Sequence, residues 1–344
     1  MSTTQTTAAA PAPSVSPVAP QAAPSLAFNS QNEYGDWRDD FFKNGYYVFK
    51  GAVPKEKATE YYYKKALDWL QSFDNGFDLN NKETWTKEHL PQSFKNMYLH
   101  YCAAQEKFMW DARTEPNVIK PFAELWGTDE LVVSFDAFNV TLPGRKDDDF
   151  RPWPHTDQAP ERKGLSCVQG LLNLTPAGPK DGGLLLTVGS SALFEEYFKT
   201  HPIRPRISSD AKHYDLYLFQ PDELEWFKSK GCREIKVEAE PGDLVLWDSR
   251  TIHHVAKVES EQIRSVMYVC MTPRALATPE DLALKKDIFE RYEATTHWPH
   301  CNIWRQGKAM IDGKLDPLER DEPLEKPVLT DQILRLAGVK PYNE

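Results

Sequence analysis

A histidine and an aspartate that stand two residues apart, His155 and Asp157, are the residues of this chain best suited to hold a metal ion. In an extended segment, residues i and i+2 point to the same side, so both side chains could bind one ion from one face. A second histidine from a distant strand would complete a set of two nitrogens and one carboxylate. Such a set leaves coordination positions open for dioxygen and for a bidentate co-substrate. The spacing therefore predicts a mononuclear metal site at His155 and Asp157.

The same spacing occurs a second time, at His213 and Asp215. Asp157 is followed by a strand-like run, residues 167–174, whereas Asp215 leads toward a helix that begins with a proline. We therefore expect His213 and Asp215 to be ordinary surface residues outside the barrel. On spacing alone, a plain hydrogen bond between His155 and Asp157 in a loop is an equal alternative to a metal site.

Arg264 lies in the strand-like run 263–271, and its neighbours on the same strand face are Val266, Tyr268 and Cys270. A guanidinium on a mostly apolar face needs an anion when it is buried. The run itself holds no acidic residue, so the anion is either a distant Asp or Glu or a bound carboxylate, which a guanidinium can bind with two parallel hydrogen bonds. An exposed edge strand, which would need no anion, is the remaining alternative.

Two adjacent histidines, His253 and His254, compete for the place of the third ligand. Neighbours in an extended chain face opposite sides, so only one of them can point inward. If the strand at 244–247 continues without a bulge, His254 shares a face with Asp248 and Arg250. Because two charged groups suit an outer surface, we predict that His253 is the histidine that points inward.

Short strand-like runs in the middle of the chain must position these side chains. They span residues 131–142, 167–174, 183–188, 235–237, 244–247 and 263–271. Short strands at this spacing are typical of a β-sandwich or barrel, here with a helical insertion near 191–201 and 221–229. The pattern predicts a mainly β fold with flanking helices.

One enlarged domain over residues 33–344 is the expected organisation. Its part from about 34 to 127 is predicted to be helical, with a helix at 116–126 closed by Gly127. The β core is expected at about 129–275, and a helical and loop extension at about 278–344. Residues 1–32, rich in Ala, Pro, Ser and Thr, are predicted to form a disordered tail.

The net charge of −10 and the pI near 5.5 argue against a nucleic-acid partner and an anionic membrane surface. No apolar run is long enough to span a bilayer. The five cysteines are scattered, without a Cys-x-x-Cys pair, and predict reduced thiols in a cytoplasmic protein. The oligomeric state cannot be predicted from these features.

At the residues described above, the sequence resembles the phytanoyl-CoA dioxygenase-like family of iron(II)- and 2-oxoglutarate-dependent oxygenases. The matching segments are PWPHTDQAP at 152–160, CVQGLLNL at 167–174, DGGLLLTVGSS at 181–191 and PGDLVLWDSRTIHH at 241–254. The segment FFKNGYYVFKGAVPKE at 41–56 also resembles the usual opening of the family. One departure is Ser191, which stands where the family commonly has a histidine that is not a metal ligand.

The resemblance implies a double-stranded β-helix, or jelly-roll, core and an Fe(II) ion held by His155, Asp157 and His253. It further implies that Arg264 binds the far carboxylate of the co-substrate 2-oxoglutarate. Gln169 and Thr187 fall where the family often places additional contacts with co-substrate or substrate. The implied reaction is the hydroxylation, or another oxidation, of a small organic molecule with O2, which releases succinate and CO2.

Three residues of the C-terminal part, His297, His300 and Cys301, could in principle bind zinc, but no second pair of ligands follows them. Trp153, beside the metal motif, could line a substrate pocket or belong to the core. Two other functions stay open. One is a cupin-like metalloenzyme that does not use 2-oxoglutarate, and the other is a barrel that has lost catalysis and serves as a binding module.

Overall fold

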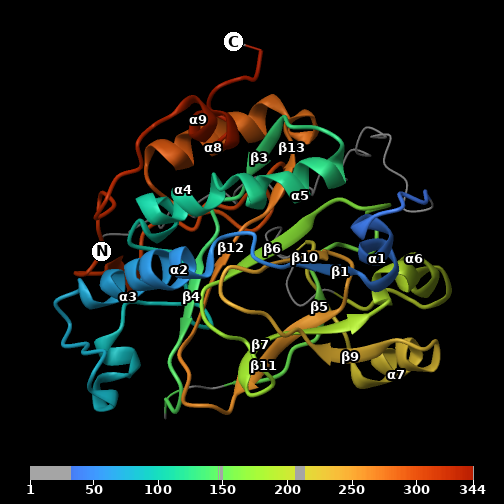
Figure 1. Ribbon diagram of the computed structural model, residues 1–344, viewed down its shortest axis with the longest axis horizontal. Helices are drawn as coiled ribbons and strands as arrows, with labels where there is room; N and C mark the ends of the chain where they lie inside the picture. The colour runs from blue at the N-terminus through green and yellow to red at the C-terminus, as the bar shows by residue number, and fades with distance from the viewer. Residues whose placement is uncertain (1–31, 146, 148–149, 206–213, 344) are drawn as a thin grey trace, which may run out of the picture.

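The computed structural model describes residues 32–145, 147, 150–205 and 214–343, and its mixed helical and strand elements are drawn in Figure 1. The helices are α1 Trp37–Asn44, α2 Lys55–Lys57, α3 Lys64–Gln71, α4 Lys107–Arg113, α5 Pro116–Trp126, α6 Ser190–Thr200, α7 Pro221–Ser229, α8 Pro279–Glu290 and α9 Asp331–Leu336. A π-helical segment, Ala58–Tyr63, joins α2 to α3. The predicted tail, apart from Asn32, and His213 lie outside the described residues.

The strands that surround the site belong to two antiparallel sheets. The first has the order β1 Tyr46–Phe49, β10 Leu244–Asp248, β6 Val168–Asn173, β12 Arg264–Tyr268, β4 Phe138–Thr141 and β2 Met97–Tyr98. The second has the order β8 Tyr217–Leu218, β5 His155–Thr156, β11 His253–Val258, β7 Asp181–Val188 and β9 Arg233–Lys236. Two short pairs complete the strands, β3 Leu131–Val133 with β13 Met271–Pro273 and β14 Met310–Ile311 with β15 Lys314–Leu315.

The chain passes back and forth between the two sheets. Strands β4, β6, β10 and β12 lie in the first sheet, and the strands that alternate with them, β5, β7, β9 and β11, lie in the second. Side chains from the facing surfaces share one apolar core, which includes Leu171, Leu186, Trp247 and Val266. This is the double-stranded β-helix, or jelly-roll, that the family resemblance implied.

The opposite face of the first sheet is covered by the helices of the N-terminal part, which Figure 1 shows beside β4 and β12. Leu172, Leu246 and Met267 alternate with the inward residues of their strands and pack into a large cluster with Trp69 of α3 and Phe122 of α5. The period of two along each strand thus divides the apolar side chains between two cores. One core lies between the sheets, and the other lies under the helices.

Most predicted elements are observed, and two predicted strands are each divided. The run 131–142 forms β3 and β4, with residues 134–137 as a loop between them. In that loop the amide of Phe135 donates to the Thr295 hydroxyl at 2.9 Å, a partner more than 150 residues away in sequence. The run 263–271 is likewise divided into β12 and β13. The local sequence pattern cannot predict such a break in a strand, because the backbone groups bond to distant residues outside the sheet.

The helix predicted at 116–126 is α5, with Pro116 in its first turn and Gly127 in the left-handed conformation after its end (φ 66°). The predicted helical insertion is α6 and α7. The N-terminal part also supplies β1, which pairs with β10, so it contributes directly to the sheet that carries the site. Within the described ranges, no helix is long and apolar enough to cross a bilayer.

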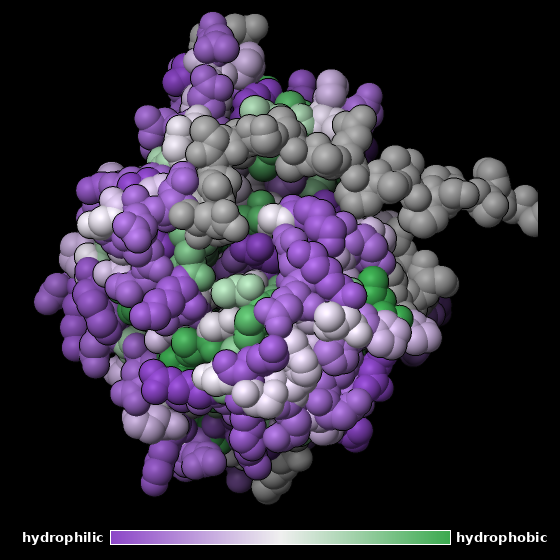
Figure 2. All heavy atoms as spheres, turned by 90° about the vertical axis from the view of Figure 1, so that its right-hand side faces the viewer, coloured by the Kyte–Doolittle hydropathy of each residue, from purple (hydrophilic) through white to green (hydrophobic). Residues whose placement is uncertain are grey.

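Figure 2 looks onto the side of the molecule that carries α1, α6 and α7. Hydrophilic residues cover most of this face and surround a hollow in which hydrophobic residues are visible.

Candidate metal centre

Three side chains with metal-binding atoms converge at one end of the second sheet: His155, Asp157 and His253. His155 on β5 and His253 on β11 are directly opposite each other in the antiparallel register, which brings their rings to a centroid distance of 4.3 Å. Asp157 follows β5, where its amide donates to the Ser249 carbonyl at 3.0 Å. One candidate ligand atom from each of the three residues lies within 4.8 Å of the other two.

Backbone carbonyls fix the orientation of both imidazoles. The Nδ1 of His155 lies 2.8 Å from the carbonyl oxygen of Trp153, and the Nδ1 of His253 lies 2.9 Å from that of Thr251. A carbonyl oxygen only accepts, so each Nδ1 carries a proton, and in the neutral ring Nε2 keeps its lone pair for a metal. Burial, followed by the neighbouring His253, also lowers the pKa of His155 and favours the neutral, metal-binding form.

The carboxylate of Asp157 is held between the two rings. Its Oδ2 lies 3.2 Å from Nε2 of His253 and 3.6 Å from Nε2 of His155. The side-chain amide of Gln169 donates to the same oxygen at 2.8 Å. Burial, the largest influence, raises the pKa of Asp157, yet His297, His155 and His253 together hold it well below its usual range. The group is therefore a carboxylate, as a metal ligand must be.

Arg264 is buried, with 4% of its surface exposed, at the start of β12. Its NH1 donates to Oδ1 of Asn139 at 3.3 Å, and its Nε is buried without a hydrogen-bond partner. Among the described residues, no Asp or Glu oxygen lies within 4.0 Å of this guanidinium. A Cβ at Gly183 would come within 2.9 Å of Nε, so the glycine leaves room beside the guanidinium. The arrangement provides a positively charged group with an unused donor, suited to a carboxylate from outside the chain.

A cavity of about 830 Å³ joins these groups. Its walls come from residues within 87–99, 136–145, 150–157 and 253–258 and within 295–306 of the C-terminal extension, and include Asp147, Gln169, Gly183, Arg264 and Tyr268. Trp153 lies on the wall and stacks on the ring of His155 at 3.9 Å, while Nζ of Lys95 lies 3.2 Å from the centre of the Trp153 ring. Trp153 therefore lines the cavity, which resolves the alternative left open by the sequence.

Gln169 and Thr187, the two residues predicted to contact co-substrate or substrate, differ in their position relative to the cavity. Gln169 lies in the cavity and bonds to Asp157, so its visible role is to orient that carboxylate. Thr187 lies on β7 but is not among the cavity residues, and its backbone groups bond to Ile252 and Ser190. Contact of Thr187 with a co-substrate stays a prediction that this geometry does not support.

The expectation that Asp215 is a surface residue is wrong, because 2% of it is exposed. Its carboxylate accepts from Nε of Arg162 at 2.5 Å and from NH2 at 3.0 Å, and further from Asn302 and the amide of Ala159. The local sequence gave no sign of this ion pair, since Arg162 lies 53 residues away. With its oxygens used in this way, Asp215 joins the β5–β8 region to the C-terminal extension.

His253 points toward Asp157, as predicted, but the strand face assumed to be an outer surface is not one. The strand ends at Asp248, and a turn precedes β11. Asp248 and Arg250 are buried and form a salt bridge of 2.6 Å, so they do not mark an outer surface. His254 instead directs Nε2 toward Glu234 at 2.8 Å.

The C-terminal extension brings to the cavity residues that no sequence motif marked as site residues. His297, Trp298 and Asn302 line it, together with Asp136 from the β3–β4 loop. His300 and Cys301 contact each other, with 3.2 Å between Nε2 and Sγ, but the described residues contain no three-ligand group there. All five cysteines are unpaired thiols.

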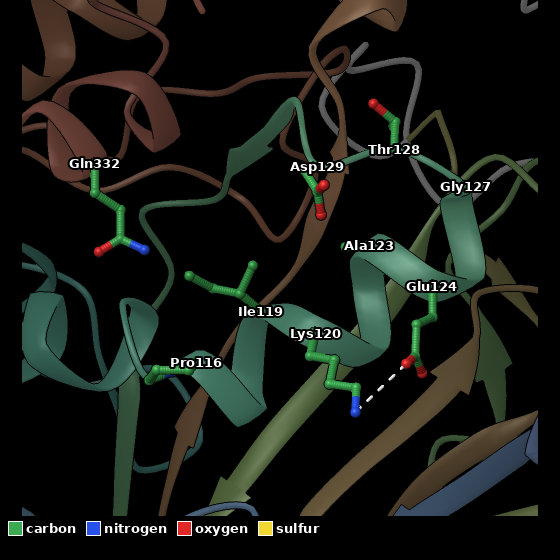
Figure 3. A pocket seen from close by; sticks show the side chains of 9 residues that line it. All are labelled: Pro116, Ile119, Lys120, Ala123, Glu124, Gly127, Thr128, Asp129 and Gln332. Atoms are coloured by element: carbon green, nitrogen blue, oxygen red, sulfur yellow. Dashed lines mark ion pairs between the residues drawn. The ribbon is translucent and has the colours of Figure 1, made fainter.

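A second, shallower hollow of about 540 Å³ lies on the outer side of α5 (Figure 3). Its nine lining residues include neither histidine nor cysteine, and its Lys120 and Glu124 form a salt bridge of 3.7 Å. The hollow offers no group comparable to the cluster at His155.

Comparison with known proteins decides the family. The phytanoyl-CoA dioxygenase (PhyH) family model matches residues 41–266. This chain belongs to that family. The Ava biosynthesis cluster protein O of Aspergillus versicolor is 46% identical over 301 residues, which are 87% of this chain and 96% of that protein. A putative phytanoyl-CoA dioxygenase of Dictyostelium discoideum is 22% identical over 284 residues, which are 68% of this chain and 74% of that protein.

The structure of GlcNAc Inducible Gene 2 from Candida albicans has the same fold, with a TM-score of 0.59 and 14% identity over 91% of this chain and 79% of that one. Membership of the phytanoyl-CoA dioxygenase family confirms the predicted reaction class. The chain is a non-haem iron enzyme that uses 2-oxoglutarate as co-substrate and O2 as oxidant.

Proposed function

We propose that His155, Asp157 and His253 hold the Fe(II) ion of this phytanoyl-CoA dioxygenase family member. Three observations support the assignment: the convergence of the three ligand atoms, the two Nε2 lone pairs directed inward, and the carboxylate form of Asp157. Two nitrogens and one carboxylate on one side of an ion suit Fe(II) and leave further positions open. Gln169 acts by keeping Oδ2 of Asp157 directed at the site.

We further propose that Arg264 binds the far carboxylate of 2-oxoglutarate. The single observation that carries this proposal is the buried Nε of Arg264, which has no partner within the described part of the chain. An unpaired donor on a buried cation costs free energy until an anion arrives. Asn139 holds the guanidinium from one side, and Gly183 leaves space on the other. Tyr268 shares a strand face with Arg264 and Val266, and it lies beside the guanidinium on the cavity wall.

The remaining side chains position the substrate and exclude water. When bound, iron, 2-oxoglutarate and O2 supply the oxidant that reacts with a C–H bond of the substrate. Trp153 covers the ring of His155 on one side, and Trp298, which is buried, closes the cavity from the C-terminal extension. Arg162 and Asp215 anchor this extension through Asn302.

The substrate we propose is a small organic molecule with a largely apolar body. The cavity wall carries Leu90, Phe94, Leu99, Leu216 and Val255 besides its two tryptophans. The relative from a biosynthesis cluster supports a role in the oxidation of a metabolite, with hydroxylation as the simplest outcome. The five unpaired thiols support a cytoplasmic setting.

The test is the formation of succinate by purified protein with Fe(II), 2-oxoglutarate and air, screened against a metabolite library. We expect substrate-dependent succinate that disappears when Asp157→Ala is used and persists when Asp147→Ala, a carboxylate at the cavity rim, is used. Metal binding without any use of 2-oxoglutarate would favour a different cupin-like metalloenzyme. Wild-type protein that binds neither the metal nor 2-oxoglutarate would favour an inactive binding module.

A further inference from the structure

A buried carboxylate on the cavity wall is not used by the metal centre. Asp136 lies in the β3–β4 loop with 9% of its surface exposed, and it lines the cavity that contains Asp157 and Arg264. Its Oδ1 accepts from the amide of Ala137 at 2.7 Å. Among the described residues, no Lys, Arg or His nitrogen lies within 4.0 Å of its oxygens. A buried carboxylate that lacks a cation is costly, and such groups concentrate at functional sites.

A second unsatisfied group faces the same space. His297, on the C-terminal extension, lines the cavity, and its Nε2 is buried without a hydrogen-bond partner. His297 lowers the pKa of both Asp136 and Asp157, so its imidazole lies near both carboxyl groups, and it bonds to neither. Asp136 and His297 come from segments about 160 residues apart in the chain. Their meeting at one wall is a feature of the folded cavity rather than of a local turn.

The cations of the region are engaged elsewhere. Arg113 lies behind the wall, where its NH1 and NH2 donate to the backbone carbonyls of Ala104 and Asp136. At the rim, Arg145 is paired with Asp147 and Lys95 lies over Trp153. Lys87 and Arg151 also line the cavity, and both are exposed to solvent.

The charges of the metal, the co-substrate and the two residues proposed to bind them, Asp157 and Arg264, balance. Fe(II) and Arg264 together carry three positive charges, and Asp157 and a bound 2-oxoglutarate together carry three negative charges. Asp136 adds a further carboxyl group on the cavity side; burial raises its pKa, and a positively charged ligand beside it would favour its charged form. The cation behind the wall, Arg113, bonds to the peptide oxygen of Asp136 and not to its carboxylate. The lining also includes Lys87, Lys95, Arg145 and Arg151 and the carboxylates of Asp147 and Asp215, so a positively charged ligand is complemented locally by Asp136 and not by the net charge of the cavity.

Building on the proposed function, we propose that Asp136 and His297 form the polar anchor of the substrate, and that the substrate is an apolar molecule that carries a positively charged nitrogen. Asp136 accepts an N–H of this group, and Nε2 of His297 accepts or donates a second hydrogen bond beside it. The apolar walls hold the rest of the molecule. The anchor decides which molecules enter and in which orientation they face the metal, so it determines specificity.

The test is isothermal titration calorimetry without oxygen, on protein loaded with Fe(II) and 2-oxoglutarate. The probes are three compounds of similar shape: 4-phenylbutylamine, 4-phenyl-1-butanol and 4-phenylbutyrate. We expect the wild type to bind the amine at least about tenfold more tightly than the alcohol, and the acid most weakly, since a buried charge pair is lost in each replacement. In Asp136→Asn the preference of the amine over the alcohol should fall to within about threefold.

Asp147→Asn is the matched control, because it removes a carboxylate from the same cavity at a position already paired with Arg145. It should keep the preference for the amine. His297→Gln should weaken the amine less than Asp136→Asn does. If the wild type binds the three probes equally, or if Asp136→Asn binds 2-oxoglutarate normally and keeps the full preference, the inference is wrong. Titration of 2-oxoglutarate alone, run first on the same samples, tests the proposed function separately, so the two failures are distinguishable.

Discussion

At the scale of single residues, the site depends on which atoms are free to bind and which are already used. Nδ1 of His155 and of His253 is used by a backbone carbonyl, which leaves Nε2 of each for a metal. The sequence could identify His155 and Asp157, because the spacing of two has a direct geometric meaning in an extended chain. It could not derive the orientation of His253 for the right reason, because that depends on the turn after Asp248 and on a buried salt bridge with Arg250.

The two adjacent histidines should respond differently to substitution. We expect His253→Ala to lose iron at stoichiometric metal and all succinate formation, because Nε2 of His253 faces Asp157. His254→Ala is the matched control and should retain the metal, because its Nε2 is directed at Glu234. Metal content after gel filtration measures both. Loss of iron from the His254 variant alone would transfer the ligand role to that residue.

Arg264→Ala should keep iron but weaken 2-oxoglutarate binding by about 2–5 kcal/mol, the usual loss when one member of a buried charge pair is removed. Calorimetry on the iron-loaded protein measures the loss. Arg264→Lys should recover little of it, because an ammonium lacks the planar fork that matches a carboxylate. An unchanged affinity for 2-oxoglutarate in Arg264→Ala would remove Arg264 from the co-substrate site.

At the scale of elements, the strands were predictable and their ends were not. The alternation of apolar residues along β6, β10 and β12 is a local property, so it can be found in the sequence. The loop at 134–137 and the contacts of Asp215 depend on partners in the C-terminal extension, such as Thr295 and Asn302. Asp136 and His297 also meet only in the folded chain, and neither belongs to a motif, so the sequence did not identify them as a pair.

Asp215→Ala should retain metal but lower the free energy of unfolding by about 3–5 kcal/mol, because it leaves Arg162 buried without its anion. Chemical denaturation measures this loss. Asp222→Ala provides the control, since Asp222 is 74% exposed and paired with Arg204 at the surface, and its loss should be below about 1 kcal/mol. Equal effects of the two substitutions would contradict the anchoring role of Asp215.

The packing of α8 on β3 should make stability depend on pH. Lys285 of α8 is fully buried, donates to the Val133 carbonyl at 2.6 Å and lies 4.2 Å from the centre of the Phe135 ring. Burial, with Arg113 nearby, lowers its pKa from 10.5 to about 7. Between these two values the unfolded chain binds a proton that the folded protein excludes, so this residue makes stability rise with pH across that window.

Urea denaturation at pH 7 and pH 9 measures the effect against Lys285→Met, which cannot titrate. We expect the wild type to gain about 1–3 kcal/mol relative to the variant between these pH values. The informative result is whether the stability of the wild type relative to the variant rises or falls with pH. A difference that is constant, or that shrinks as the pH rises, would show that Lys285 keeps its proton in the folded protein.

At the scale of the whole molecule, two sheets hold the ligands and the surrounding segments enclose them. His155 and His253 stand opposite each other within the second sheet, whereas Gln169 and Arg264 reach the cavity from the first sheet. The family resemblance made this fold predictable as a unit, since the matched segments are the strands themselves. Residues within 295–306 of the C-terminal extension also line the cavity. These residues lie beyond residue 266, where the family match ends.

The central claim is that the three residues hold Fe(II) in a form that then binds 2-oxoglutarate beside Arg264. The most direct measurement is the visible charge-transfer absorption that appears when a 2-oxo acid chelates Fe(II), recorded without oxygen during titration with 2-oxoglutarate. We expect the band to saturate at one co-substrate per protein, to be absent in His253→Ala, and to need a higher concentration of 2-oxoglutarate in Arg264→Ala. Iron-loaded wild-type protein that shows no band at any concentration of 2-oxoglutarate would contradict the account.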